Sequence, residues 1–390
     1  MGSIFDYIAW RGDLTLEQSP FNAVDNVILT HLSYFPLDGI VPGPGSEAGA
    51  GRNAGTDAPA ISDAAKVLAA VLYDGSPQKK SPKPDVIFKK DPALLEALGN
   101  SRRFGGMKLA GFVNQIDPVE EKQFAALTIL TGDGCAFIAY RGTDDSIVGW
   151  KEDFNMAFSD EVPAQGEAVQ YLKTMAGRFK MPLRIGGHSK GGNLASYAAA
   201  FCPARIQKRI TEVYLNDAPG FSDKVINTEG YQAIKSKFRS FIPQGSVVGL
   251  LFEHDCDHTV VKSSNIGLFQ HDIYSWEIMG NDLVRLPGIN KGSRFMAATI
   301  KEWLADLDMK QRRDSIEALF TILNSTEAKS FFDFGSDWLK NSAAMIKSFT
   351  NLDSHSRKIL AKTLKVFFQT ARNNIPVLLP PRAGKPQFIA

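Results

Sequence analysis

The sequence has few cysteines, almost no net charge and no long apolar segment. Its 390 residues include three cysteines at wide spacings, which excludes a disulfide framework and favours a reducing compartment. The 44 Lys and Arg nearly balance the 42 Asp and Glu, and a net charge of +2 argues against a dedicated nucleic-acid binder. No apolar run reaches the roughly 18 residues typical of a transmembrane helix, and no signal peptide is evident. We therefore expect a cytoplasmic globular protein.

The hydrophobic pattern changes character along the chain. From residue 108 apolar residues recur with a period of two, and Asp133-Gly134 between two such runs is typical of a β-hairpin. Short strands then alternate with helices, an order that indicates a parallel sheet in an α/β protein. The expected strands are 124–130, 135–140, 182–185 and 212–215, and the expected helices are 21–32, 62–72, 167–179 and 191–200.

Only helical spacing remains after about residue 290. We therefore predict an α/β domain over 1–290, a helical extension over 291–375 and a proline-containing tail over 376–390. The stretch 41–60 is rich in Gly, Ala and Pro without an apolar period, which predicts a flexible surface loop.

The motif that carries chemistry is GHSKGG at 187–192, a G-x-S-x-G pattern between a predicted strand and a helix of small residues. This context is typical of a nucleophile elbow, in which Ser189 stands on a tight turn above the sheet. Side chains at Gly187, Gly191 or Gly192 would collide with the neighbouring strand and helix. We therefore predict Ser189 as a nucleophile.

A serine nucleophile needs a base and a group that orients the base. In α/β-hydrolases the chain order is serine, acid, histidine, which favours His271, after a glycine-containing loop. Asp217 is the leading acid because it follows the strand after the elbow helix, and Asp255 and Asp257 are rivals nearer to the histidine. The other histidines after the serine are His254, His258 and His355.

Backbone N–H groups that could stabilise an oxyanion come from two places. One is Lys190, which directly follows the predicted nucleophile, and the other is Thr143, in the Gly-Thr turn after the strand 135–140. This chemistry requires no cofactor.

Two further segments have both a functional and an ordinary interpretation. The segment 253–258, EHDCDH, is dense in metal-ligand types, but it lacks an HExxH order and we predict a polar loop without a metal. The basic, amphipathic stretch 356–372 could contact an anionic membrane peripherally, although packing with a solvated basic face is the commoner use of such a helix.

At this point the motifs resemble a known family. YRGT at 140–143, with Trp150 and Asp153 after it, and GHSKGG at 187–192 resemble the class 3 lipase pattern of the α/β-hydrolase superfamily. The chain is also similar to a bacterial, lipase-like domain-of-unknown-function family, sometimes called Mbeg-like. The segments that carry this second resemblance are FDYIAWRGDLTLEQSPFNAVDNVILTHLSYF, NDAPGF at 216–221, IPQGSVVGLL at 242–251 and QHDIYSW at 270–276.

The resemblance implies an α/β-hydrolase fold, a mostly parallel sheet flanked by helices. It also suggests Ser189, His271 and the backbone of Thr143 and Lys190 as parts of an active site. NDAPGF is similar to the segment where pancreatic-type lipases carry their acid, which favours Asp217.

The sequence departs from class 3 lipases at three points. Lys190 follows the serine where those enzymes usually have Leu, and Ser246 stands where their aspartate is expected. No apolar lid is evident between Asp145 and Glu167.

These features predict a serine hydrolase that cleaves a carboxylic ester, a lipid or lysophospholipid being one option, through an acyl-enzyme. The alternative is a catalytically inactive lipase-like scaffold that binds a lipid or a protein partner, because fold alone does not fix function.

Overall fold

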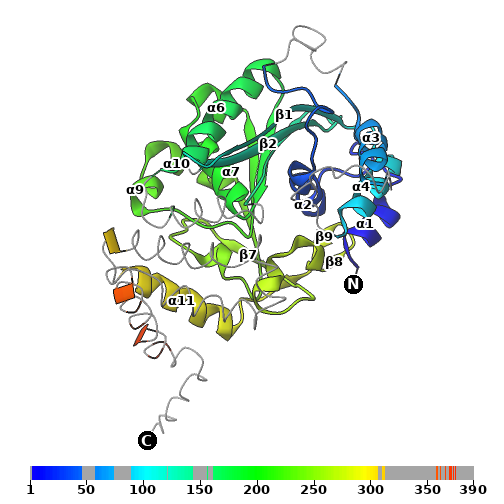
Figure 1. Cartoon of the computed structure of the whole chain (residues 1–390). Helices are drawn as coiled ribbons and strands as arrows, with labels where there is room; N and C mark the ends of the chain where they lie inside the picture. The colour runs from blue at the N-terminus through cyan, green and yellow to red at the C-terminus, as the bar shows by residue number, and fades with distance from the viewer. Residues whose placement is uncertain are drawn as a thin grey trace, which may run out of the picture.

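A single eight-stranded sheet runs through the centre of the protein in the computed structural model, in the order β1-β2-β3-β4-β5-β6-β7-β10 (Figure 1). The strands from β3 to β7 are parallel, whereas β2 is antiparallel to both β1 and β3, and β10 is antiparallel to β7. The predicted fold class, a mostly parallel sheet flanked by helices, is therefore confirmed.

The structure describes most of the first 305 residues and scattered positions after them. The described residues are 2–45, 58–73, 89–120, 122–143, 156, 161–305, 310–311, 357, 358, 361, 365, 369, 370, 372 and 374. Within them, the strands are β1 (Lys108–Asp117), β2 (Lys122–Leu130), β3 (Ala136–Tyr140), β4 (Leu183–His188), β5 (Ile210–Asn216), β6 (Phe238–Pro243), β7 (His258–Val261), β8 (Ile278–Met279), β9 (Asp282–Leu283) and β10 (Arg285–Leu286). The α-helices are α1 (Ile4–Arg11), α2 (Ala23–His31), α3 (Ile61–Tyr73), α4 (Asp91–Asn100), α6 (Pro163–Arg178), α7 (Lys190–Phe201), α8 (Ala204–Gln207), α9 (Asp223–Ile226), α10 (Glu229–Ile234) and α11 (Lys291–Ala305).

Helices cover both faces of the sheet and bury a separate apolar core on each. Figure 1 shows α1 to α4 gathered on one side and α6, α7 and α10 on the other. The first core joins side chains of α1 to α4 with one face of the strands, and the second joins α6 and α7 with the opposite face. Strands buried on both faces have continuous apolar runs rather than alternation, as β3 does with all five residues buried.

The local predictions for this domain are largely confirmed. The hairpin of β2 and β3 is antiparallel, and Gly132 and Gly134 in its turn have φ angles of 87° and 81°, which favour glycine. Helices α2, α3, α6 and α7 and strands β4 and β5 occur where the periodicity predicts them. The short helices α1 and α4 were not predicted.

The stretch 41–60, for which the composition predicts a flexible surface loop, is described only at its two ends, and residues 46–57 lie outside the described residues. At these ends Gly45 is exposed, whereas Val41, Ala58 and Ala60 are 5%, 8% and 7% exposed. Ala60 forms a β-bridge with Lys108 at the start of β1, so this end of the stretch is part of the packed domain.

Of the predicted helical extension, α11 is described as a helix and most of the rest lies outside the described residues, as does the tail. Asn374 is buried and donates a hydrogen bond of 2.9 Å to Glu302 of α11, and the described basic residues Arg357, Lys358 and Lys365 are exposed. This contact favours packing of the segment on α11, with its basic side chains solvated. The domain boundaries and the membrane contact remain predictions.

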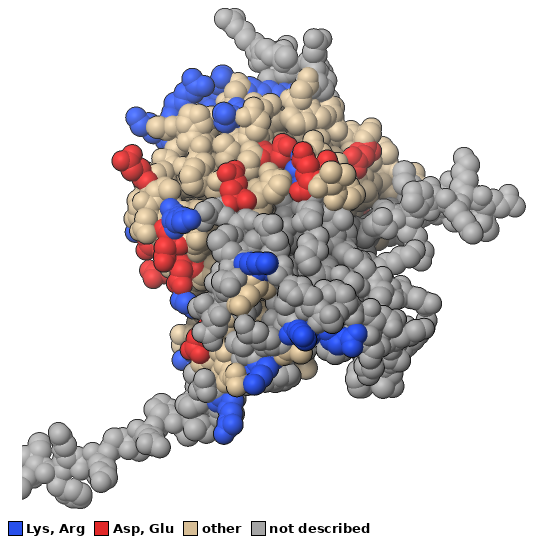
Figure 2. All heavy atoms as spheres, turned by 60° about the vertical axis from the view of Figure 1, so that its left-hand side comes forward, with Lys and Arg blue, Asp and Glu red and all other residues tan. Residues whose placement is uncertain are grey.

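The described surface carries charges of both signs. On the face drawn in Figure 2, acidic and basic side chains both occur, in keeping with the net charge of +2. Among the described residues, no helix has the length and hydrophobicity needed to cross a membrane.

Candidate active site

Ser189 occupies the turn between β4 and α7, at the carboxyl edge of the parallel strands. Its φ and ψ angles are 58° and −134°, a conformation that non-glycine residues rarely adopt. The backbone N–H of Ser189 donates to the carbonyl of Asn216 at the end of β5, at 3.0 Å. The side chain is 9% exposed. This is the strained strand–turn–helix geometry of a nucleophile elbow.

The elbow glycines are required by close backbone packing. A Cβ atom at Gly187 would lie 2.0 Å from the backbone of Gly191, and one at Gly191 would lie 2.1 Å from the carbonyl oxygen of Tyr140. Gly192 is similarly tight, because its Cβ would lie 2.5 Å from that of Ala218. The steric role predicted for these glycines agrees with their surroundings.

The predicted acid and base are in direct contact. Asp217 Oδ2 and His271 Nδ1 are 2.6 Å apart, and the carboxylate is only 1% exposed. Because a carboxylate accepts, Nδ1 donates its hydrogen to Asp217, and Nε2 is the ring nitrogen outside this bond. Asp217 directly follows β5, and its own φ angle is 48°. His271 ends the short 3₁₀ segment Gly267–His271.

The other carboxylate oxygen of Asp217 is held by the loop that follows β6. Ser246 donates its hydroxyl hydrogen to Oδ1, and the backbone N–H of Gly249 donates to the same oxygen at 3.1 Å. Ser246 therefore occupies the position where class 3 lipases have an aspartate. Here it donates a hydrogen bond to Asp217, which follows β5. Ser293 of α11 in turn donates to the Ser246 carbonyl, which ties this loop to the start of the helical extension.

His188, the residue before the nucleophile, connects the elbow to the base. Its Nε2 lies 2.8 Å from the carbonyl oxygen of His271, and the two rings have centroids 4.3 Å apart. Since a carbonyl only accepts, Nε2 carries the proton and Nδ1 accepts from the Tyr34 hydroxyl at 3.3 Å. The Tyr34 oxygen accepts the N–H of Gly142 at 3.0 Å. Burial lowers the pKa of His188 well below its ordinary value and keeps the ring neutral.

This network places His271 beside the elbow without a direct bond to the nucleophile. Among the described residues, no hydrogen bond joins the Ser189 hydroxyl to the His271 ring. Such bonds are often long in enzymes without substrate and tighten when a substrate is bound.

The two predicted sources of oxyanion N–H groups lie at the elbow. Lys190 is the first residue of α7, so its N–H is at the positive end of the helix dipole. Its side chain is 1% exposed and donates to the carbonyl of Gln123 on β2 at 3.1 Å, which explains how a lysine replaces the usual leucine. A Cβ atom at Gly142 would lie 3.0 Å from that of Ser189, which brings the Gly142–Thr143 turn next to the nucleophile.

The rival acids are engaged elsewhere or exposed. Asp255 bonds to Lys235 at 2.7 Å and to Gln232 at 2.9 Å, and Asp257 is exposed. His355, Trp150 and Asp153, together with most of the segment in which a lid was sought, lie outside the described residues.

Sequence reasoning missed the residues that support the acid and the base. Ser246 was visible as a departure from the lipase pattern, but its contact with Asp217 was not foreseen. Tyr34 and His188 gave no chemical signal, because an isolated tyrosine and the variable position of G-x-S-x-G are uninformative by themselves.

A family model described as Mbeg1-like matches residues 98–321, more than half of the chain. The chain belongs to the Mbeg1-like family. This match includes the elbow, Asp217 and His271, whereas Tyr34 of the supporting network lies before the matched region. None of the curated proteins matches the sequence.

The similar solved structures include fungal lipases, at low similarity. The Rhizomucor miehei lipase propeptide complex is 14% identical with a TM-score of 0.32, covering 43% of this chain and 58% of that one. A Rhizopus microsporus lipase is 13% identical with a TM-score of 0.33, covering 44% and 65%. The Yarrowia lipolytica Lip2 lipase is 14% identical with a TM-score of 0.29, covering 58% and 83%. The matched part of this chain spans less than two thirds of the first two lipases.

We predict that Gly191→Ala destabilises the protein by about 1–3 kcal/mol or more, because its methyl group would overlap the Tyr140 carbonyl. Urea unfolding measures this change. Gly177→Ala in α6 is the control: its Cβ meets nothing within 4 Å, and the change is expected to stabilise by up to about 1 kcal/mol. An unchanged free energy of unfolding for the Gly191 variant would contradict the close packing of Gly191 against the Tyr140 carbonyl.

Proposed function

We propose that this protein is a serine hydrolase that cleaves a carboxylic ester through Ser189, His271 and Asp217. The observation that carries the proposal is the 2.6 Å contact between Asp217 and His271, beside a serine held at a φ angle of 58°. A buried carboxylate that fixes the Nδ1–H tautomer of a histidine is the second half of a catalytic triad. No cofactor enters the reaction.

In the proposed reaction, Ser189 Oγ attacks the acyl carbonyl while His271 Nε2 accepts its proton. The tetrahedral oxyanion is stabilised by the N–H groups of Lys190 and Thr143, each worth about 2.7–4 kcal/mol in such sites. Collapse of this intermediate expels the alcohol, which takes the proton from His271, and leaves an acyl group on Ser189. Water activated by His271 then releases the acid. Asp217 stabilises the imidazolium in both halves.

Exposed apolar side chains that shortly precede the base in the sequence support a substrate with an apolar acyl chain. Ile266 and Phe269, on the segment that leads to His271, are 79% and 62% exposed. Exposed apolar side chains of this size are costly to leave in water, and neighbours of a catalytic histidine can cover part of an acyl chain. We therefore place fatty acyl esters, which include lysophospholipids, ahead of short esters.

The nucleophile is tested by labelling with a fluorophosphonate probe, which reacts with an activated serine. Wild-type protein is expected to label, whereas Ser189→Ala is expected to remain unlabelled and His271→Ala to react too slowly to detect. Asp217→Asn should label about 10,000-fold more slowly, because an amide no longer favours the productive histidine tautomer.

Ser246→Ala serves as the matched control for Asp217→Asn. It leaves the carboxylate and the Gly249 N–H bond in place, so we expect a labelling rate lowered only about 10-fold, the effect of one lost hydrogen bond to a charged group. If folded wild-type protein stays unlabelled, with and without liposomes, the result would contradict the enzyme hypothesis. It would favour the alternative, a lipase-like binding scaffold without catalytic activity.

The acyl preference is tested with the double variant Ile266→Ser/Phe269→Ser on p-nitrophenyl esters of increasing chain length. We expect kcat/KM to fall about 10-fold for an octanoyl ester and to change little for an acetyl ester, because only the longer chain loses apolar contact. Val119→Ser is the control: Val119 is 93% exposed in the turn between β1 and β2. Equal losses for both esters would refute the apolar subsite and leave the triad untouched.

A further inference from the structure

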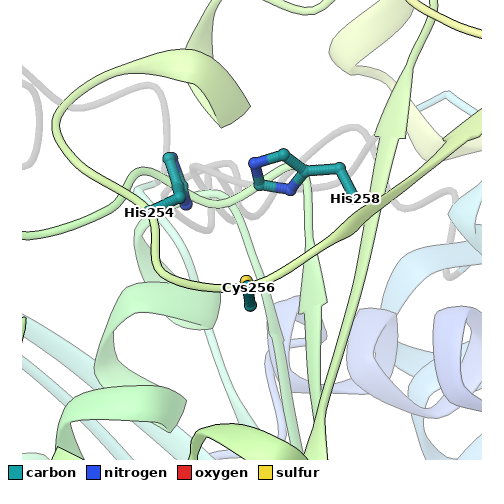
Figure 3. A group of neighbouring side chains, drawn as sticks. All are labelled: His254, Cys256 and His258. Carbon is teal, nitrogen blue, oxygen red and sulfur yellow. The ribbon is translucent and has the colours of Figure 1, made fainter.

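A second group of reactive side chains lies beyond the candidate triad, in the segment between the β-bridge at Glu253 and β7. His254, Cys256 and His258 bring a ligand atom each to within 4.8 Å of one another. Figure 3 shows the Cys256 sulfur and the two imidazole rings turned toward a common space. Among the described residues these are the three that could together hold a metal ion.

Backbone pairing holds both ends of this short segment. Glu253 and Phe221 exchange hydrogen bonds of 3.0 and 2.9 Å between their backbones. His258 is the first residue of β7 and pairs with Ser240 of β6. Backbone pairing therefore holds the His-x-Cys-x-His segment at both ends, by the bridge at Glu253 and by the sheet at His258, which a free surface loop would not provide.

Both imidazoles have a nitrogen that remains available to another partner. The Ser240 hydroxyl lies 2.8 Å from His258 Nδ1, which leaves Nε2 of that ring for another partner. The His254 ring interacts with the Leu251 backbone, and its Nε2 is buried without a hydrogen-bond partner. A buried polar atom without a partner is rare and costly, and a metal ion would satisfy it. Hydrogen bonds from the distal nitrogen are the usual support of metal-bound histidines.

We propose that His254, Cys256 and His258 form a zinc site. One thiolate and two imidazoles suit Zn²⁺ better than the oxygen-preferring Mg²⁺ or Ca²⁺. Tetrahedral bonds to nitrogen and sulfur place ligand atoms about 3.3–3.7 Å apart, so separations of up to 4.8 Å need only a small inward movement of the side chains. Three protein ligands leave the fourth position to water. The prediction from sequence that this segment holds no metal is thereby revised.

The site lies against the segment that carries the acid of the candidate triad. A Cβ atom at Gly220 would lie 3.0 Å from His254 Nε2, so this ring packs over the turn that follows Asp217. A bound Zn²⁺ would fasten the segment 254–258, which packs on Gly220, to the start of β7, a structural role independent of whether the triad is active.

The proposal is tested with Zn²⁺ and Co²⁺ on the purified full-length protein after treatment with a strong chelator. Reconstituted protein freed of excess metal is expected to retain about one Zn²⁺ per chain by elemental mass spectrometry. With Co²⁺ it should show the thiolate-to-cobalt charge-transfer band and the visible bands of a tetrahedral ion. Cys256→Ser should lose that charge-transfer band and at least about 90% of the zinc.

Two variants sharpen this test. Cys135→Ser removes another partly exposed cysteine, in the turn before β3, and should retain full zinc and the cobalt bands. Ser240→Ala should weaken Zn²⁺ binding about 10- to 100-fold without abolishing it, because only the support of His258 is lost.

Two results would overturn the site. One is equal zinc in wild-type protein and Cys256→Ser, which would locate the ion elsewhere. The other is wild-type protein with native circular dichroism that retains no zinc and gives no thiolate band with Co²⁺. If a variant fails to fold, the wild-type cobalt spectrum alone decides.

Discussion

The candidate site depends on the hydrogen bonds that the buried carboxylate of Asp217 accepts. Its Oδ2 binds His271, and its Oδ1 accepts hydrogen bonds from Ser246 and Gly249, so one side chain holds three segments of the chain together. A carboxylate that is 1% exposed has no water to replace a lost partner, so each of these bonds is costly to break. The backbone N–H of Asp217 is fixed as well, by a bond of 2.7 Å to Phe241 on β6. The position of the histidine therefore follows from the order of the parallel strands.

The parallel order of the strands explains why the residues of the candidate site lie at one edge of the sheet. In parallel strands the carboxyl ends lie side by side, and β3, β4, β5 and β6 are followed by the Gly142–Thr143 turn, Ser189, Asp217 and the Ser246 loop respectively. His188 and Tyr34 then bond the first of these turns to the carbonyl of His271. The proposed zinc site is placed differently, because His258 lies at the amino end of β7, where Ser240 on β6 supports its ring.

The sequence is sufficient to predict those features that depend on residue type and on the order of neighbouring strands. The hairpin turn, the elbow at Ser189 and the preference for Asp217 over Asp255 and Asp257 all follow from residue type and strand order, and the contact between Asp217 and His271 agrees with them. What it could not provide were pairings between residues distant in the chain. The ion pair of Asp25 with Arg103 is buried between α2 and the segment after α4, and no spacing indicates it. The convergence of His254, Cys256 and His258 likewise depends on a segment held by the bridge between Glu253 and Phe221 and by the start of β7.

The account is tested most directly by trapping the acyl-enzyme. Wild-type protein would be mixed with an activated fatty acyl ester, quenched in acid within the first turnovers, and measured by intact-mass spectrometry and peptide mapping. The account predicts one acyl group per chain, located on the peptide that contains Ser189 and absent when His271 is replaced by Ala. An acyl group that persists in Ser189→Ala, or folded wild-type protein that acquires none from any ester, would contradict it.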